Sequence, residues 1–378
     1  MAYYFNLPII TELTIPQQVV LNEVRAVSIS GGPGTGKSVV SLWRHLQNYD
    51  LDRRKSLLLT YTKSLEIYFS LALKSPNLNV KATTKTNASK ATNRTLWWTY
   101  HELSNEFDEI IIDEAQDIIL DKYELIRQCT KMVSYGIDRN QSMYLSPQKL
   151  QELVDGLPVL FPNNIIIPQL NENFRNTFQI TQFVRSLFPN TIFPNGQLNG
   201  QKPILVCTNE NQNLQNQVIF DIINQFQSDT HNIAILLPLA NPAVHRQKVV
   251  RDYYNILKNK GFNCSFYENE NGELLKIENI HITTFKSAKG LEFDTVIIPD
   301  FQYFKEDIEK LYVVSESDYY VTLTRAKRNL ILIDNSKTNM NNRCSLVFLQ
   351  SQISNNIITV DYDYIKDSQN NETDDLPF

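Results

Sequence analysis

Residues 31–38 read GGPGTGKS, a glycine-rich segment whose residue types and spacing suit a nucleotide phosphate. An apolar run predicted to be a strand precedes it and a predicted helix follows it, as a phosphate-binding loop requires. Main-chain amides and the positive end of the helix would surround phosphate oxygens, Lys37 would neutralise them, and Ser38 would hold Mg²⁺. A glycine-rich turn that contains Lys-Ser by chance is the alternative. The residues predicted to contact ATP here are Gly31, Gly32, Pro33, Gly34, Thr35, Gly36, Lys37 and Ser38.

A second segment supplies the acids that a phosphate-binding loop needs. Residues 110–117 read IIIDEAQD, so two adjacent acids end an apolar run. Asp113 would face Mg²⁺ and Glu114 would face the attacking water. An acidic turn after a strand is, by itself, more often a helix cap. The presence of the phosphate-binding loop favours the catalytic interpretation.

The elements that must position these residues follow an α/β pattern. Short apolar runs rich in β-forming residues alternate with longer amphipathic stretches, which is typical of a parallel sheet covered by helices. In the first half, strands are predicted at Ala26–Ser30, Ser56–Thr60, Glu109–Ile112, Met132–Tyr135 and Asn164–Pro168. In the second half they are predicted at Pro203–Val206, Asn232–Leu237, Ile280–Thr284, Thr295–Pro299 and Asn329–Ile333. Helices are predicted at Ser38–Gln47, Leu214–Gln225 and Val244–Lys258.

Two α/β units fit this pattern better than one large sheet. We place the first at residues 1–168, the second at residues 169–340, and a C-terminal extension at residues 341–378. Lys81–Thr95 carries four cations and no acid, so it is expected to be an exposed loop that could contact phosphates. The chain after about Asp361 lacks apolar residues and is expected to be a disordered acidic tail.

Composition excludes several classes of protein. Of the 378 residues, 42% are hydrophobic and 20% are charged, which excludes a wholly disordered or fibrous chain. No apolar run approaches the roughly 20 residues that span a bilayer, and no secretory signal is visible. Four well-separated cysteines predict reduced thiols and a cytoplasmic location. The net charge is −5, and residues 361–378 alone contribute −5, so the rest of the chain is neutral and could still present a basic groove.

The motifs, taken in order from about residue 13 to residue 333, resemble those of superfamily 1 helicases of the UvrD/Rep type. Residues 13–18 resemble the Q motif, in which Gln17, or alternatively Gln18, would read adenine. Residues 113–117 match motif II, and residues 136–144 resemble motif III, which makes Gln141 the candidate γ-phosphate sensor.

Motifs in the second half complete the resemblance. Residues 170–175 resemble motif IV, in which Phe174 would stack on adenine and Arg175 would reach the γ-phosphate. Residues 289–294 resemble motif V, with Gly290 at the site and Glu292 as the ribose contact, and residues 320–327 resemble motif VI, with Arg325 as a second arginine finger. A surface salt bridge is the alternative for either arginine. The implied catalytic residues are Lys37, Glu114, Gln141, Arg175 and Arg325, with Ser38 and Asp113 as metal ligands.

The resemblance also implies contacts with single-stranded nucleic acid, because aromatic faces stack on bases without sequence preference. Residues 60–62 resemble motif Ia and residues 98–101 resemble the next motif that contacts DNA. DNA is favoured over RNA only because the relatives are DNA translocases. The residues implied to contact nucleic acid are Thr60, Tyr61, Thr62, Thr99, His101 and Tyr144.

Two departures from the family pattern bear on activity. About a dozen positions separate His101 from Asp113, and 114 separate Arg175 from Lys289, so both large accessory insertions of the family are absent. After Tyr144 the family continues with an aromatic residue and Arg-Gly-Ala, whereas residues 145–148 here read LSPQ. These differences favour ATP hydrolysis over vigorous strand separation.

Taken as a whole, the resemblance implies an α/β fold of two tandem RecA-like domains with an ATP cleft between them. It implies an ATP- and Mg²⁺-dependent translocase or helicase that moves 3′-to-5′ along single-stranded DNA in repair, replication or anti-phage defence. The alternative is a nucleotide-gated regulatory ATPase subunit that controls a partner nuclease or effector, as in motor subunits of anti-phage systems such as Gabija. The last five residues resemble the acidic tip of bacterial single-stranded-DNA-binding proteins and would dock on a protein partner through Asp374, Asp375, Leu376, Pro377 and Phe378.

Overall fold

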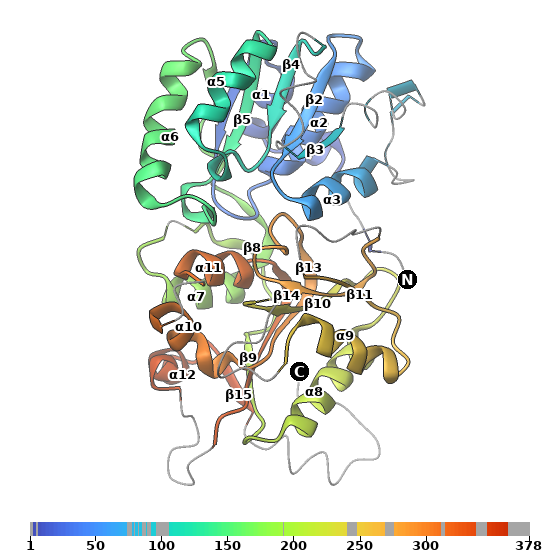
Figure 1. Cartoon of the computed structure of the whole chain (residues 1–378), viewed down its shortest axis with the longest axis vertical. Helices are drawn as coiled ribbons and strands as arrows, with labels where there is room; N and C mark the ends of the chain where they lie inside the picture. The colour runs from blue at the N-terminus through green and yellow to red at the C-terminus, as the bar shows by residue number, and fades with distance from the viewer. Residues whose placement is uncertain are drawn as a thin grey trace. The chain divides into compact units, whose positions relative to one another are not determined.

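The computed structural model describes residues 3–4, 7–73, 78, 80–81, 83–84, 88, 92–95, 106–191, 193–239, 248–268, 276–310, 314–337 and 346–361. The chain forms two compact units, each an α/β domain with a parallel sheet flanked by helices (Figure 1). The N-terminal unit comprises Phe5–Phe174, and the C-terminal unit comprises Met1–Tyr4 together with Arg175–Phe378. The expected class of two tandem RecA-like domains is confirmed.

The N-terminal unit is built on a six-stranded parallel sheet in the order β3-β2-β4-β5-β1-β6. Its strands are β1 Val27–Ser30, β2 Ser56–Thr60, β3 Thr92–Thr95, β4 Glu109–Ile112, β5 Met132–Ile137 and β6 Ile165–Ile166. β2 and β4 are buried along their whole length, which is why they read as continuous apolar runs. Carboxyl ends of parallel strands share one edge of a sheet, so the segments that follow β1, β2, β4 and β5 meet there.

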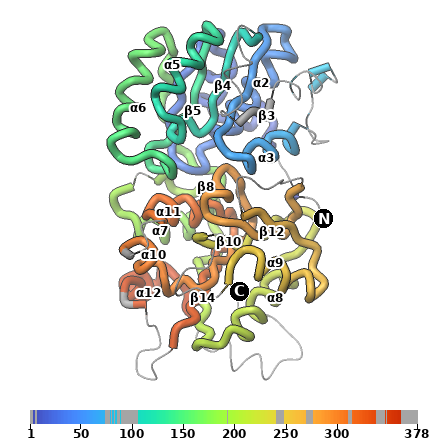
Figure 2. The backbone as a smooth tube through the Cα atoms, in the orientation of Figure 1, coloured from blue at the N-terminus to red at the C-terminus, as the bar shows by residue number. Residues whose placement is uncertain are grey.

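The helices of this unit lie between the strands in sequence. They are η1 Ile10–Glu12, α1 Ile15–Asn22, α2 Lys37–Asp50, α3 Lys63–Leu73, η2 Ala115–Asp117, α5 Leu120–Cys129, η3 Arg139–Gln141 and α6 Pro147–Leu160. α2 begins directly after the glycine-rich loop and packs against the sheet through buried side chains that include Val40, Trp43 and Leu46. The rainbow-coloured tube in Figure 2 follows this alternation of strand and helix along the chain.

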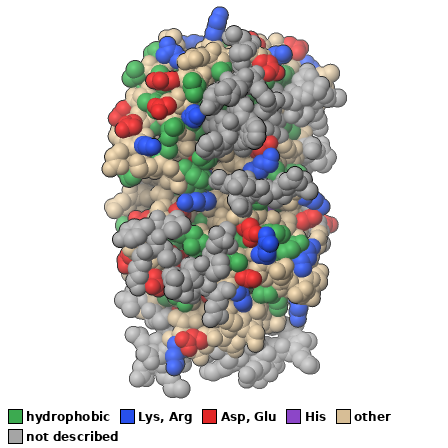
Figure 3. All heavy atoms as spheres, in the orientation of Figure 1, with side chains coloured by type: hydrophobic (Ala, Val, Ile, Leu, Met, Phe, Trp, Pro, Cys, Tyr) green, Lys and Arg blue, Asp and Glu red, His purple; other side chains and the backbone are tan. Residues whose placement is uncertain are grey.

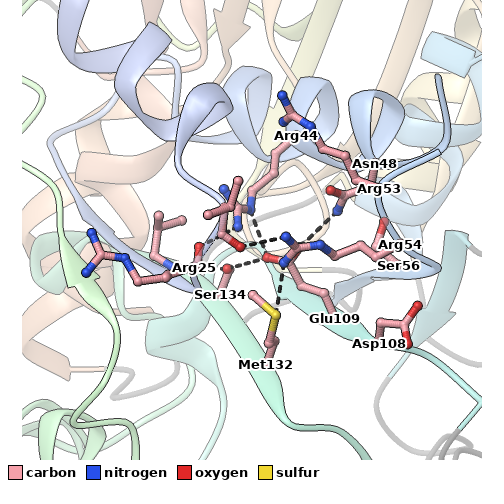
Figure 4. Close-up of polar contacts among 12 residues, drawn as sticks. Arg25, Arg44, Asn48, Arg53, Arg54, Ser56, Asp108, Glu109, Met132 and Ser134 are labelled. Carbon is pink, nitrogen blue, oxygen red and sulfur yellow. Dashed lines mark hydrogen bonds and ion pairs between the residues drawn. The ribbon is translucent and has the colours of Figure 1, made fainter. Parts of the chain in front are cut away.

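A buried carboxylate joins α2 to the amino ends of β4 and β5. Figure 4 shows Glu109, which is fully buried, surrounded by polar partners from several elements. Its carboxylate accepts hydrogen bonds from Arg44 Nε at 2.8 Å, Asn48 Nδ2 at 2.9 Å and Ser134 Oγ at 2.6 Å. The Arg44 guanidinium also donates to three main-chain carbonyls, so both charges have their hydrogen bonds satisfied. Breaking such a pair leaves an uncompensated buried charge.

We therefore expect Glu109→Ala to lower the free energy of unfolding by about 3 kcal/mol. The measurement is urea denaturation followed by circular dichroism. Glu23→Ala is the matched control, because Glu23 pairs at the surface with Arg25 and its loss should change the unfolding midpoint little. Equal midpoints for the two variants would contradict this account of the buried pair.

The C-terminal unit holds a seven-stranded parallel sheet in the order β11-β12-β10-β13-β14-β9-β15 and a two-stranded sheet of β7 and β8. The strands are β7 Asn173–Thr177, β8 Gly196–Leu198, β9 Ile204–Cys207, β10 Ile233–Leu237, β11 Ser265–Tyr267, β12 Ile280–Thr284, β13 Phe293–Ile298, β14 Ala326–Asp334 and β15 Thr359–Asp361. The helices are α7 Phe178–Leu187, α8 Gln212–Phe226, α9 Val250–Asn259, η4 Phe301–Tyr303, α10 Phe304–Lys310, α11 Glu316–Leu323, η5 Val347–Leu349 and α12 Gln350–Ser354. Its core gathers aliphatic side chains from β9, β10, β12 and α8.

The ten predicted strands are all present, and the structure adds elements that the sequence did not reveal. β3 lies within the segment that was expected to be an exposed loop, where Thr84 and Ala88 are also buried. The polar composition of this segment concealed its packing, since Thr84 Oγ1 donates to Asp50 Oδ1 at 2.9 Å and His45 Nε2 lies 3.4 Å from the Ala88 carbonyl oxygen. Lys85 and Lys90 lie outside the described residues.

The unit boundary falls six residues later than residue 168, where the sequence placed it. Residues 169–174 still pack on the N-terminal unit, because Leu170 N–H donates to the Ser30 carbonyl and Phe174 N–H donates to the Gly34 carbonyl, each at 2.9 Å. Residues 346–361 pack on the C-terminal unit, where β15 extends the sheet beside β9 and Gln352 Nε2 donates to the Ser186 carbonyl at 3.1 Å. The acidic tail from residue 362 lies outside the described residues. Within the described part of the chain, no helix combines the length and apolar character needed to cross a bilayer.

Candidate nucleotide site

The glycine-rich loop connects β1 to α2 and folds around the side chain of Lys37. Gly34 and Gly36 have φ values of 71° and 85°, a left-handed conformation that favours glycine. A Cβ atom on Gly36 would lie 2.5 Å from Gln17 Nε2. The buried Lys37 ammonium donates to the carbonyl oxygens of Gly31 at 2.8 Å and Gly32 at 2.9 Å. The loop thus holds its cation in place at the start of a helix, where phosphate binds favourably.

Ser38 and Asp113 lie together, as expected for the two protein ligands of a magnesium ion. Ser38 Oγ donates to Asp113 Oδ2 at 2.7 Å, and Asp113 is buried at the end of β4. Hydroxyl and carboxylate oxygens suit Mg²⁺, which usually takes few protein ligands and completes its shell with water and phosphate. Among the residues that the structure describes, no group of three or more His, Cys, Asp or Glu side chains could hold a metal. The donors at this position fit Mg²⁺ bound together with a nucleotide.

Glu114 belongs to a buried chain of hydrogen bonds at the carboxyl edge of the sheet. Its main chain has a φ of 57°, a strained conformation for a residue with a side chain. Gln116 Nε2 donates to the Glu114 carboxylate, and Gln116 Oε1 accepts from the Asp138 N–H at 3.0 Å. Gln141 Nε2 donates to Asp138 Oδ2 at 2.6 Å, and Lys37 Nζ lies 3.5 Å from the same oxygen. Motifs II and III and the glycine-rich loop therefore share one polar network.

Gln116 and Asp138 are absent from the residues that the sequence nominated for the site. Both lie inside motifs that the sequence did identify, Gln116 two positions after Glu114 and Asp138 directly after β5. For Asp138 the available signal was its position, since a polar side chain immediately after a buried strand of a parallel sheet faces the same edge as the glycine-rich loop. Gln116 lies further from its strand, in η2, so only its place inside motif II pointed to it.

Of the two adjacent glutamines in the Q motif, Gln17 is the one that contacts the loop. Gln17 Oε1 accepts from the Thr14 N–H at 2.8 Å, and Gln17 Nε2 donates to the Thr35 carbonyl at 3.0 Å. Gln18 Nε2 instead donates to the Leu13 carbonyl at 2.7 Å. The geometry thus separates two residues that spacing alone left open.

Motif IV and motif V meet within the C-terminal unit. Arg175 Nε donates to Glu292 Oε2 at 2.9 Å, and Lys327 Nζ lies 3.9 Å from Glu292 Oε1. Burial raises the pKa of Glu292, but the cations of Arg175 and Lys327 outweigh it and hold the pKa below its usual value. Gly290, two residues earlier, has a φ of 83° that favours glycine. Glu292 is therefore an ionised carboxylate that orients Arg175.

Arg325 and Phe174 have contrasting environments. Arg325 is 1% exposed, and its guanidinium donates to the carbonyls of Val321 at 2.9 Å and Leu291 at 3.2 Å. Such burial excludes the interpretation of Arg325 as a surface salt bridge. The Phe174 side chain is 48% exposed, as a ring that stacks on a ligand would be. Each of these residues was nominated from the sequence.

The candidate nucleic-acid contacts are only partly brought together. Tyr61, after β2, and Tyr144, after η3, are both half-buried with ring centroids 4.7 Å apart and planes tilted by 54°. Thr60 is fully buried at the end of β2. Thr62 Oγ1 accepts from the Leu65 N–H at 3.2 Å and so supports the start of α3.

Two further candidates, Thr99 and His101, lie outside the described residues. On the face shown in Figure 3, cationic and acidic side chains of the described residues are interspersed.

The segment that departs from the usual motif III forms the start of α6. Ser146 Oγ accepts from the Lys149 N–H at 3.4 Å, and Pro147 is the first residue of α6. Serine at the cap and proline at the first position are a favourable helix start. The segment that carries an aromatic residue and an arginine in the family thus begins a helix here.

Comparisons with known proteins find helicases among the relatives of this chain. Residues 25–198 match the family model described as Schlafen group 3, DNA/RNA helicase domain, and residues 246–337 match the model of the UvrD-like helicase C-terminal domain. A curated relative from Acanthamoeba polyphaga mimivirus, described as putative ATP-dependent DNA helicase R568, is 26% identical over 235 residues, or 58% of this chain. The chain spans about a third (33%) of the length of that relative.

Solved helicase structures resemble the chain at low sequence identity. Arterivirus nonstructural protein 10 is 14% identical with a TM-score of 0.40, over 84% of this chain and 62% of that one. The PRRSV helicase is 15% identical with a TM-score of 0.43, over 85% of this chain and 54% of that one. The two family models and the curated relative point in the same direction. The chain is similar to ATP-dependent helicases of the superfamily 1 type over parts of both of its units.

Proposed function

We propose that this chain hydrolyses ATP and uses the energy to move along single-stranded DNA. The observation that carries the proposal is the continuous polar network that links Lys37, Glu114 and Gln141 through Gln116 and Asp138. Phosphoryl transfer needs positioned charges far more than it needs covalent chemistry. A network that places a cation, a carboxylate and an amide at one sheet edge meets that need.

Each residue then has a distinct role. Lys37 would neutralise the β- and γ-phosphate oxygens. Ser38 and Asp113 would hold Mg²⁺, which would supply further positive charge near the phosphates. Glu114 orients the attacking water and accepts its proton. Gln141 would respond to the γ-phosphate and pass the change to Asp138 through its hydrogen bond, and from there to Lys37 through the ion pair with Asp138.

The C-terminal unit completes the reaction in this proposal. Arg175, oriented by Glu292, and Arg325, held by main-chain carbonyls, would stabilise charge on the transferring γ-phosphoryl group. Gln17 and Phe174 would contact adenine. Since these arginines belong to a different unit from the glycine-rich loop, ATP turnover would be coupled to a change between the two units.

The finer features are also part of the proposal. Tyr61 and Tyr144 would stack on bases, and the family resemblance supports a 3′-to-5′ direction. A role in repair, replication or anti-phage defence follows from the same resemblance, and a cytoplasmic location follows from the well-separated cysteines, of which Cys129, Cys207 and Cys264 are buried. The acidic tip of Asp374–Phe378 would dock on a protein partner.

A second candidate is a nucleotide-gated regulatory subunit without productive unwinding. It is favoured by the helix cap at Ser146, which occupies the place of the family's coupling segment. Duplex unwinding by the isolated chain separates the two functions. We expect ATP-dependent translocation on single strands with weak unwinding of a duplex of about 20 base pairs, and a Tyr61→Ala, Tyr144→Ala double variant should lose translocation. Sustained unwinding would exclude the regulatory candidate, and the absence of any movement on DNA would exclude the motor.

A further inference from the structure

Tyr3 lies deep inside the C-terminal unit, although it stands 289 positions before the residue that it contacts. Its hydroxyl donates to the main-chain carbonyl of Glu292 and accepts from the Glu292 N–H at 3.3 Å. Its ring meets the ring of Phe293 edge-on, with centroids 5.8 Å apart. The side chain is 6% exposed, and burial raises its pKa well above the usual value, so the hydroxyl keeps its proton.

Main-chain hydrogen bonds fix Tyr3 and Tyr4 on the C-terminal unit. The Tyr3 N–H donates to the Ile277 carbonyl at 3.0 Å. Asn232 brackets Tyr4, since its Oδ1 accepts from the Tyr4 N–H at 2.8 Å and its Nδ2 donates to the Tyr4 carbonyl at 2.7 Å. These hydrogen bonds hold Tyr3 where its hydroxyl contacts Glu292, the residue that orients Arg175.

Glu292 needs support of this kind because of its position. It directly precedes β13, whose first residue, Phe293, donates its N–H to the Arg325 carbonyl at 2.9 Å. The Tyr3 hydroxyl pairs both main-chain groups of Glu292, while Arg175 and Lys327 contact its carboxylate. Tyr3 therefore holds the main chain of Glu292, and Arg175 of motif IV holds its side chain.

The contact with Glu292 also lies close to the points where the chain passes between the two units. The chain passes from one unit to the other twice, between Tyr4 and Phe5 and between Phe174 and Arg175. On the side of the C-terminal unit, Arg175 at one crossing and Tyr3, one residue before the other crossing, both contact Glu292. Ten residues after Tyr4, the Thr14 N–H donates to Gln17, the candidate adenine contact.

We propose that Tyr3 is a positioning residue of the nucleotide site, which holds the main chain of Glu292 so that its carboxylate orients Arg175 and meets the ribose. The inference rests on the proposed function for the roles of Glu292 and Arg175. It assigns a part in nucleotide recognition to the N-terminal residues, which precede every motif of the family. Tyr3 acts through Glu292 and does not itself touch the nucleotide.

The test is Tyr3→Phe, which removes the hydroxyl and keeps the ring that packs on Phe293. Equilibrium affinities for ATP and for 2′,3′-dideoxyATP are measured with Mg²⁺, alongside the thermal midpoint. Because a buried carbonyl and N–H lose their partner, we expect ATP affinity to fall about 5- to 10-fold. Affinity for the dideoxynucleotide should change little, so that the preference for ATP approaches that of Glu292→Gln. Tyr4→Phe is the matched control, since no hydrogen bond of its hydroxyl is found among the described residues, and it should behave as wild type.

The outcomes separate this inference from the proposed function. Loss of the ATP preference in Tyr3→Phe but not in Tyr4→Phe, with no further loss in the Tyr3→Phe, Glu292→Gln double variant, would support the positioning role. An unchanged preference, or additive effects in the double variant, would overturn it. ATP hydrolysis by the wild type is measured separately: binding without hydrolysis would contradict the proposed function alone, and no binding of ATP would contradict both.

Discussion

Glu114→Gln should lower kcat for ATP hydrolysis by roughly 10²- to 10⁴-fold, with ATP affinity nearly unchanged. Glutamine has the same shape as glutamate and can still accept the hydrogen bond from Gln116 Nε2, so the buried network should survive. What is lost is the negative carboxylate that takes a proton from the attacking water. Steady-state hydrolysis and equilibrium binding of ATP, measured on the same preparation, separate the two effects.

The control for this variant is Glu124→Gln, the same substitution on the exposed face of α5. It should leave both kcat and affinity at the wild-type value. If Glu114→Gln kept a rate within a few-fold of wild type, the proton acceptor would be another group. If it lost ATP binding as well, the network that includes Gln116 and Asp138 would depend on the charge of Glu114, and the variant would say nothing about catalysis.

Arg175→Ala should lower kcat by roughly 10³-fold or more, since an arginine that stabilises the transferring phosphoryl group contributes on this scale. The substitution leaves Glu292 near Lys327, so the carboxylate keeps a cationic partner and the C-terminal unit should remain folded. Arg325 is a poorer target, because its buried guanidinium donates to two main-chain carbonyls and its removal would destabilise the fold. Pre-steady-state hydrolysis would show whether the chemical step is the one that slows.

Arg251→Ala is the matched control for Arg175→Ala. Arg251 lies in the same unit and pairs at the surface with Glu268, so its loss should change neither rate nor stability appreciably. A small effect of Arg175→Ala on kcat, comparable to that of the control, would show that the Arg175–Glu292 pair is only structural.

How far the sequence predicts this protein depends on the kind of contact. Strands such as β2 and β4 are predicted well because burial on both faces makes them continuous apolar runs. The glycine-rich loop is predicted because phosphate binding demands particular residue types at fixed spacing within one short segment. Features that depend on about ten consecutive residues can therefore be predicted from the sequence.

Contacts between segments that lie far apart in the sequence cannot be predicted in the same way. The Tyr3 hydroxyl reaches Glu292 across 289 positions, and no local pattern marks a tyrosine near a chain terminus as buried. β3 was missed because Thr92–Thr95 is polar and joins the sheet as an edge strand beside β2. Gln17 and Gln18 could be distinguished only by their hydrogen-bond partners.

The central claim is that ATP hydrolysis by this chain is coupled to single-stranded nucleic acid. The most direct measurement is the steady-state ATPase rate of the wild type with and without single-stranded DNA, with Glu114→Gln as the blank. We predict strong stimulation by single-stranded DNA that disappears in the variant. A wild-type rate that is indifferent to both DNA and RNA would contradict the coupling and leave a nucleotide-gated subunit as the function to pursue.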